Sequence, residues 1–250
     1  MAQEINGTIL KLTMITNFRI RGLSTFFVGH YLSHSELVAS DPNITGYSKP
    51  NHSRDKIINR AKKEHVEGKY DLLGLYLDKQ RTNTVLELGG SNGECWYGFQ
   101  SDYDLDYHIV ETEQCVEYGK ERFKDFPKLS YHTQIPDLGK IDIFYCRTSL
   151  QYAEDWRKTL TDVITKNKPN LIILDRTELE ETEETHYISQ VFQFTHDLFA
   201  SIMPYCIING SDLNSFLSSG GYQQINGNKN CEEERHWFND YEPNARLKIK

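Results

Sequence analysis

Residues 85–93 read Val85-Leu86-Glu87-Leu88-Gly89-Gly90-Ser91-Asn92-Gly93. Four residues typical of a β-strand run into a turn that is rich in glycine. A strand that ends beside an acid, followed by such a turn and a helix, is how a doubly wound sheet brings its backbone close to a nucleotide-like ligand. Glycine has no Cβ and tolerates positive φ, so we expect Gly89, Gly90 and Gly93 to leave room for an adenosyl group.

From residue 84 onward, short apolar runs alternate with amphipathic stretches, a pattern typical of strands and helices around a mainly parallel sheet. The run at 171–175 is continuously apolar until it ends at Asp175, so both faces of that strand should be buried. The sequence therefore predicts an α/β fold, doubly wound and mainly parallel, with strands at 85–88, 108–111, 129–132, 141–146 and 171–175.

The first eighty residues have a different character, being polar and rich in turn residues at 41–46. They predict helices joined by a loop. We therefore expect an N-terminal helical extension over residues 1–80 and one cofactor-binding domain over residues 81–250.

Composition narrows the possible partners. The 250 residues hold 28 Lys and Arg against 36 Asp and Glu, and the net charge of -8 would repel a phosphate backbone, which argues against nucleic acid. The chain has no run of about 18 apolar residues and no signal-peptide pattern at its start. We expect a cytoplasmic protein without a membrane span.

The five cysteines are scattered and never form a C-x-x-C pair, so they suggest neither a disulfide framework nor a zinc site. The acidic run from Glu178 to Glu184 lacks the ligand spacing of a calcium loop and is interpreted as a solvated face or a lid. No metal is expected.

The glycine pattern separates two cofactor classes. The dinucleotide fingerprint G-x-G-x-x-G fails in both frames, because Ser91 or Asn92 stands where its second glycine belongs. No G-K-[ST] triplet of a phosphate-binding loop is present either. Glu87, two residues before Gly89, instead resembles the acid of the D/E-x-G-x-G-x-G signature of class I methyltransferases, with Ser91 replacing the middle glycine.

A second acid supports this interpretation. Glu111 ends the second expected strand, where a doubly wound fold places a carboxylate on ribose hydroxyls. Because those hydroxyls donate hydrogen bonds and a carboxylate only accepts them, the groups are complementary.

Several short motifs follow one another along the chain: Phe27-Val28-Gly29-His30-Tyr31, Gly46-Tyr47, residues 85–90, Val110-Glu111-Thr112, Ser149-Leu150-Gln151-Tyr152, Leu174-Asp175-Arg176, Gln190 and Gly221-Tyr222. In these motifs, from about Phe27 to Tyr222, the chain resembles the methyltransferases found with bacterial surface-polysaccharide genes, those of O-antigen and capsule. The departures are glutamate for the usual aspartate at Glu87, and Ser91 with Asn92 in the turn. The resemblance implies a seven-stranded class I sheet, S-adenosylmethionine as cofactor, and O- or N-methylation of a small molecule such as a sugar or glycan precursor.

Ligands of open α/β sheets bind beyond the carboxyl ends of the strands. Residues at those ends are thus the candidates for cofactor binding, together with Gln134, which lies where adenine contacts fall in this fold. The set is Glu87, Gly89, Gly90, Ser91, Gly93, Glu111, Thr112, Gln134, Arg147 and Thr148.

Methyl transfer needs alignment and, for an oxygen acceptor, removal of a proton. We expect His186 to be the general base, since imidazole titrates near neutrality; the alternative is an exposed loop histidine. Asp175 either orients an acceptor hydroxyl or caps the next turn. Arg176 either binds a phosphate or carboxylate of the substrate, or pairs with Glu178 or Glu180.

Two other functions stay open. The chain could bind cofactor or sugar without turnover and serve as an assembly partner, because no residue is an unmistakable base. An NAD-dependent sugar-modifying enzyme is the third possibility, and the missing glycine frame disfavours it.

Overall fold

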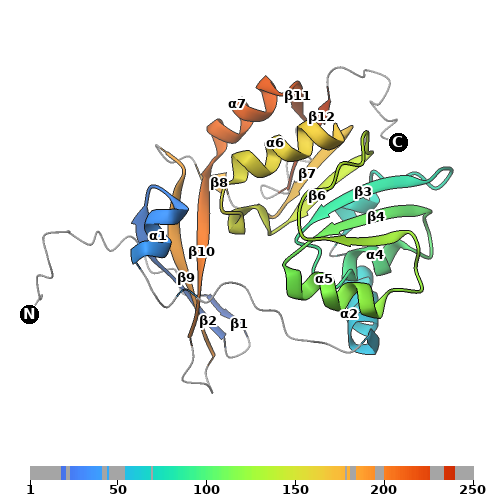
Figure 1. Cartoon of the computed structure of the whole chain (residues 1–250), viewed down its shortest axis with the longest axis horizontal. Helices are drawn as coiled ribbons and strands as arrows, with labels where there is room; N and C mark the ends of the chain where they lie inside the picture. Colours follow the sequence, from blue (N-terminus) through green and yellow to red (C-terminus); the bar gives the residue numbers. More distant parts are fainter. Residues whose placement is uncertain are drawn as a thin grey trace, which may run out of the picture. The chain divides into compact units, whose positions relative to one another are not determined.

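The computed structural model describes residues 18–20, 23–40, 44, 54–68, 70–177, 179–180, 184–194, 200–225 and 234–239. The chain divides into two units, and each joins segments that are distant in the sequence. The small unit comprises Met1–Ser48 and Leu179–Asn209; the large unit comprises Lys49–Glu178 and Gly210–Lys250. In Figure 1 the small unit accordingly combines blue elements with orange ones.

Among the described residues of the large unit, seven strands form one sheet, in the order β11-β12-β7-β6-β3-β4-β5. β12 (Glu234–Asn239) pairs antiparallel with both β7 and β11 (Tyr222–Ile225). The other five strands are parallel, which confirms the predicted mainly parallel α/β class. They are β3 (Asn83–Leu88), β4 (Leu105–Val110), β5 (Leu129–His132), β6 (Ile143–Arg147) and β7 (Leu171–Asp175).

Strand order changes direction at β3. The chain places β4 and β5 on one side of β3 and then returns to place β6 and β7 on the other. Leu88 is in register with both Val110 and Cys146, so β3, β4 and β6 end level with one another. Loops that diverge from such a point leave a crevice at the carboxyl edge of the sheet, the usual ligand site of this architecture.

Helices lie on both sides of this sheet (Figure 1). One face of the parallel strands shares a core with the first four helices of the unit, through residues such as Ile57, Trp96 and Val116. α6 and α7 pack together through Trp156 and Phe216, whose rings are 5.5 Å apart. The helices are α2 (Arg54–Val66), α3 (Asp71–Gly74), α4 (Glu94–Phe99), α5 (Glu113–Arg122), α6 (Trp156–Asn167) and α7 (Gly210–Ser219).

The small unit is a second sheet, in the order β1-β2-β9-β10-β8, packed against α1 (His34–Ser40) through the fully buried Leu37. β2 carries one extra residue opposite β9, because Val28 pairs with Ser189 but Tyr31 pairs with Tyr187. Such a bulge bends the strand. The strands are β1 (Phe18–Ile20), β2 (Leu23–Tyr31), β8 (Leu179–Glu180), β9 (His186–Phe194) and β10 (Ala200–Asn209).

This sheet corrects the expected helical extension over residues 1–80. β1 and β2 are strands, and the division between units does not fall at residue 80, because α2 and α3 belong to the large unit. The run Thr25-Phe26-Phe27-Val28 consists of β-branched and aromatic residues, which favour strands. Its pairing partner β9 lies more than 150 residues later, so no local pattern revealed it.

Gly46, Tyr47, Glu178 and residues 181–183 lie outside the described residues. Within the described part of the chain, no helix has the length and apolar character needed to cross a bilayer. The same residues contain no group of three or more His, Cys, Asp or Glu side chains that could hold a metal ion.

Candidate functional site

The glycine turn follows β3 and leads into α4. Gly89, Ser91 and Gly93 have φ of 73°, 58° and 82°, the left-handed region. This conformation suits glycine but costs other L-residues roughly 1–2 kcal/mol. Ser91 adopts it nonetheless, so serine in place of the middle glycine preserves the shape of the turn.

The glycines are also required by the protein's own packing. A Cβ at Gly89 would lie 2.3 Å from Ser149 Oγ, and a Cβ at Gly90 would lie 2.4 Å from Glu87 Oε2. A Cβ at Gly93 would lie 2.7 Å from the Tyr131 hydroxyl. Neighbouring side chains therefore press against the turn, and any larger residue would displace them.

Glu111, the acid at the end of the second expected strand, lies against this turn. Its Oε1 accepts a hydrogen bond from the Ser91 amide at 2.9 Å, and its Oε2 accepts one from the Thr112 amide at 2.8 Å. The residue is half-buried. Each carboxylate oxygen has two lone pairs, so both oxygens retain acceptor capacity for ligand hydroxyls.

Glu87 faces the interior of the sheet. It is 4% exposed, and its Oε2 accepts a hydrogen bond from the Tyr107 hydroxyl at 2.9 Å. Burial, reinforced by the charge of Glu87, raises the pKa of the neighbouring Cys95 thiol well above its ordinary value. Glu87 thus supports the turn from beneath, packed against Gly90, within a buried polar cluster.

A buried ion pair stands at the ends of β6 and β7. Arg147 Nε donates to Asp175 Oδ2 at 2.8 Å, and the Tyr145 hydroxyl donates to the same oxygen at 2.8 Å. Burial raises the pKa of Tyr145 well above its ordinary value, so this phenol stays protonated and continues to donate. The Arg147 guanidinium lies 5.6 Å from the centre of the Tyr70 ring, and its Nη2 is buried without a hydrogen-bond partner.

The Asp175 carboxyl group is 3% exposed and accepts from two donors, one of them on Arg147. Arg176, the next residue, is exposed and has a left-handed φ of 51°. Thr148 is also exposed and left-handed, and its amide donates to the Asp175 carbonyl at 3.0 Å.

Ser149 was missed as a functional residue by reasoning from sequence. Its hydroxyl lies 2.8 Å from the Leu88 carbonyl and 2.7 Å from the Arg147 carbonyl, so it joins the loop after β6 to the end of β3. The only sequence signal was its place in the Ser149-Leu150-Gln151-Tyr152 motif. Tyr107 and Tyr145 were missed because alternating strand residues do not show which hydroxyls meet buried acids.

His186 begins β9 and belongs to the small unit, whereas the other candidates belong to the large unit. It is half-buried and stacks on His30 with ring centres 4.4 Å apart. Its Nδ1 lies 3.3 Å from the Glu184 carbonyl. The bulge at Gly29, where φ is 90°, sits immediately before His30.

The structure therefore brings most of the candidates to one edge. The large unit gathers the turn, Glu111 and Arg147 at the level ends of β3, β4 and β6. Thr112 is the N-cap residue of α5, and its exposed side chain makes no capping hydrogen bond. Gln134 is exposed in the loop after β5.

No protein-family model and no curated protein matches this sequence. Solved structures do resemble it. DesVI of Streptomyces venezuelae aligns with a TM-score of 0.52 and 10% identity, over 76% of this chain and 98% of DesVI. The CcbJ methyltransferase from Streptomyces caelestis aligns at 0.49 and 12% identity, over 70% of this chain and 89% of its own.

A third neighbour is the structure of SAM-bound CalS10, an amino pentose methyltransferase from Micromonospora echinaspora. Its TM-score is 0.48 at 9% identity, over 77% of this chain and 99% of CalS10. The structural neighbours thus include S-adenosylmethionine-dependent methyltransferases. At 10% identity, the likeness to DesVI shows a shared fold and nothing more.

Proposed function

We propose that this chain binds S-adenosylmethionine at the carboxyl edge of the large sheet and methylates a small molecule, a sugar or glycan precursor. The hydrogen bond between Glu111 and the Ser91 amide carries the proposal, because it fixes an acceptor-rich carboxylate beside a turn without side chains at Gly89, Gly90 and Gly93. The resemblance to the polysaccharide-associated methyltransferases supports the substrate class.

The strand order indicates which residues would hold each end of the cofactor. If Glu111 at the end of β4 held the ribose, residues at the end of β6, on the other side of β3, would hold the amino-acid end. There the Nη2 of Arg147 is buried and lacks a partner, an arrangement that costs free energy until an acceptor arrives. The cofactor's carboxylate is such an acceptor, so the residues present fit this group.

Bound S-adenosylmethionine would supply a methyl group on a positively charged sulfur. The chain's own residues would align it. Asp175 and Tyr145 hold Arg147 in one orientation, and Ser149 keeps the loop after β6 against the turn. Such prior positioning is the main contribution that a protein makes to this kind of displacement.

For an acceptor hydroxyl we propose His186 as the general base. A carbonyl oxygen can only accept a hydrogen bond, so Nδ1 beside the Glu184 carbonyl carries the proton and Nε2 keeps its lone pair. The stacked His30 restricts rotation of the ring. The exposed Arg176 would bind an anionic group of the substrate.

The first test is calorimetric titration of the protein with S-adenosylhomocysteine, with NADH as the comparison ligand. We expect S-adenosylhomocysteine to bind and NADH to show no heat of binding. Absence of binding by both S-adenosylmethionine and its product S-adenosylhomocysteine would reject the proposal. Binding of NADH alone would favour the NAD-dependent sugar-modifying enzyme.

The second test adds isotopically labelled S-adenosylmethionine and a panel of sugar phosphates and nucleotide-linked sugars. Label should enter a sugar with the wild type and be lost with His186→Ala, while both proteins bind S-adenosylhomocysteine equally. Binding without transfer to any acceptor would indicate a non-catalytic assembly module.

A further inference from the structure

The helix α2 packs against α4, the helix that begins where the glycine turn ends. Ile57 and Ala61 of α2 are buried, and the ring of His65 meets that of Phe99 on α4 with ring centres 4.9 Å apart. Gly98 makes room for this contact, because a Cβ there would lie 3.3 Å from the His65 Cβ. α2 is therefore held close to the element that carries the turn.

Two carboxylates hold consecutive amides of the turn. Glu111 accepts from the Ser91 amide at 2.9 Å, and Glu94 Oε2 accepts from the Asn92 amide at 3.1 Å. Ser91 has the left-handed φ of 58°, a conformation that costs free energy in any residue with a Cβ. The two acids together keep the turn in this shape, so a displacement of Glu94 would reach Ser91 and, through it, Glu111.

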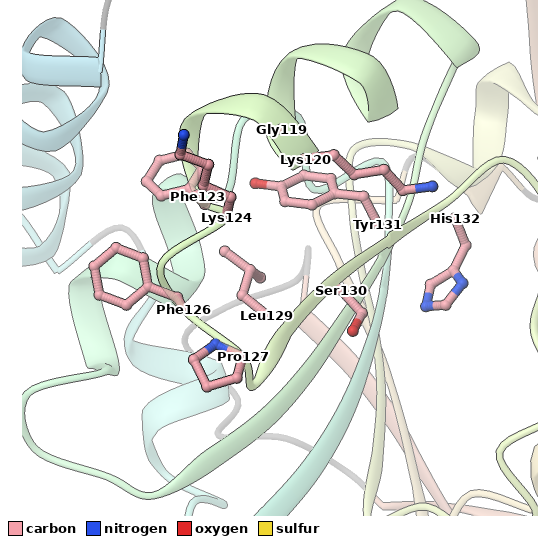
Figure 2. Close-up of a pocket in the computed structure, with 10 residues that line it drawn as sticks. All are labelled: Gly119, Lys120, Phe123, Lys124, Phe126, Pro127, Leu129, Ser130, Tyr131 and His132. Atoms are coloured by element: carbon pink, nitrogen blue, oxygen red, sulfur yellow. The ribbon is translucent and has the colours of Figure 1, made fainter.

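Tyr131 bounds the turn within the core. Its ring lies under α5 beside Gly119, where a Cβ would approach the ring to 2.3 Å (Figure 2). Its hydroxyl reaches Gly93, since a Cβ there would lie 2.7 Å from it. Burial and the charge of Glu94 raise the pKa of Tyr131, which stays protonated. Tyr131 thus closes one direction in which the turn could relax.

Arg60 of α2 supplies a positive charge beside Glu94. Glu94 is 4% exposed, and its Oε1 is buried without a hydrogen-bond partner among the described residues. Arg60 Nη1 lies 3.9 Å from that oxygen, and Nε of the same side chain donates to Glu64 Oε1 at 2.9 Å. One arginine therefore serves two buried acids. A buried carboxylate that loses its cation is strongly destabilised, so removal of Arg60 should displace Glu94.

Glu64 connects Arg60 to the other end of the proposed cofactor site. Its Oε2 accepts a hydrogen bond from the Tyr70 hydroxyl, and the Tyr70 ring centre lies 5.6 Å from the Arg147 guanidinium. Burial, followed by the hydrogen bond to Glu64, raises the pKa of Tyr70, so the phenol remains the donor. Arg147 is the residue proposed to bind the cofactor's carboxylate. Arg60 is therefore linked to both ends of that site.

We propose that Arg60 is a positioning residue of the cofactor site. By holding Glu94 it fixes the turn and the carboxylate of Glu111, and by holding Glu64 it fixes Tyr70 against Arg147. The inference rests on the proposed binding of S-adenosylmethionine. It gives α2 a part in cofactor affinity, although none of the candidates expected from the sequence lies on that helix.

The test compares affinities for S-adenosylhomocysteine, measured by calorimetry, among variants of α2. Arg60→Gln should weaken binding about tenfold, the scale of one lost hydrogen bond. Arg60→Lys keeps a positive charge beside the acids and should recover most of that affinity. The matched control Lys63→Gln breaks an exposed pair with Glu67 on the same helix and should bind within about twofold of the wild type. Since calorimetry follows the folded protein, a purely structural role for Arg60 would leave the affinity unchanged.

A double variant isolates the path through Glu94. In Glu94→Gln the neutral amide needs no cation, and its oxygen can still accept from the Asn92 amide. Adding Arg60→Gln to this variant should therefore weaken binding by about threefold or less, the remaining loss being that of the path through Glu64. In the protein without ligand, the amide resonances of Ser91 and Asn92 should shift in Arg60→Gln and stay in place in Lys63→Gln.

Two results would overturn the positioning role of Arg60: equal affinity for S-adenosylhomocysteine in Arg60→Gln and the wild type, or unchanged amide resonances of Ser91 and Asn92 in Arg60→Gln. Absence of binding by the wild type would instead reject the proposed function. The comparison of amide resonances needs no ligand, so it tests the link between Arg60 and the turn in either case.

Discussion

The carboxyl edge of the large unit and the sheet of the small unit are assembled in different ways. At the edge, the glycine turn and Glu111 come from neighbouring stretches of chain and are joined by a hydrogen bond between Ser91 and Glu111. In the small unit, β2 and β9 are adjacent in the sheet although they lie at 23–31 and 186–194. The first arrangement follows from local sequence, and the second requires closure of a long loop.

Their polar groups differ as well. The edge rests on buried charges, with Glu87 and Asp175 each fixed by a tyrosine hydroxyl. In the small unit the notable polar feature is the stacked pair of His30 and His186, which is only partly buried. Perturbing the edge should therefore cost stability and cofactor affinity together, whereas perturbing the histidine pair should alter a later step.

The largest effect should follow removal of Arg147. Arg147→Met leaves the Asp175 carboxylate buried without its cation, and we expect the free energy of unfolding to fall by about 3–5 kcal/mol. Urea denaturation measures this. Lys158→Met, which breaks the exposed pair with Asp162 on α6, is the control and should lose far less. Equal losses would show that the Arg147 pair is not a supporting element of the edge.

Gly89→Ala should rank next. The substitution combines a left-handed backbone with a Cβ 2.3 Å from Ser149 Oγ, so strain and overpacking together should cost about 2–4 kcal/mol. Gly139→Ala is the matched control, because Gly139 has the same φ of 73° and its Cβ would meet nothing within 4 Å. The difference between the two variants isolates the packing of Ser149 against the turn. A difference near zero would contradict that packing.

Part of the candidate site could be predicted from local sequence. The turn, Glu111 and the five parallel strands were predictable because each has a local pattern: glycines after an apolar strand, and an acid at a strand end. The inward direction of Glu87 was not predictable. Whether a strand-end acid faces ligand or core depends on a partner in the next strand, here Tyr107.

Two further features have the same origin. Asp175 was predicted either to orient an acceptor hydroxyl or to cap the next turn, and the orientation of its carboxylate is set by Tyr145 and Arg147, both on the neighbouring strand. The strand β2 was predicted as helix because the polar turns around it were visible and its partner β9 was not. Pairing with distant segments determines both the orientation of Asp175 and the strand conformation of β2. The periodicity within one segment does not reveal such pairing.

Glu111→Gln tests whether the carboxyl edge of the large unit binds the cofactor. The amide keeps one acceptor oxygen but loses the charge that strengthens hydrogen bonds from ribose hydroxyls, so affinity for S-adenosylhomocysteine should fall about 10- to 100-fold. Calorimetry measures the change. Glu113→Gln, an exposed acid in the first turn of α5, is the control and should bind as the wild type does. Equal affinities in the wild type and both variants would show that Glu111 does not bind the cofactor.

Gly29→Ala tests the histidine pair of the small unit and should have the smallest effect on stability. Gly29 has a φ of 90°, so alanine there adds strain of about 1–2 kcal/mol; the nearest atoms belong to the Tyr31 ring, which can move aside. The strained bulge should shift His30 relative to His186, seen as altered imidazole resonances. Affinity for S-adenosylhomocysteine should stay within about twofold of the wild type, since no residue of the bulge holds the cofactor in our proposal, while methyl transfer falls. Loss of cofactor affinity in Gly29→Ala would contradict the proposal that no residue of the bulge holds the cofactor.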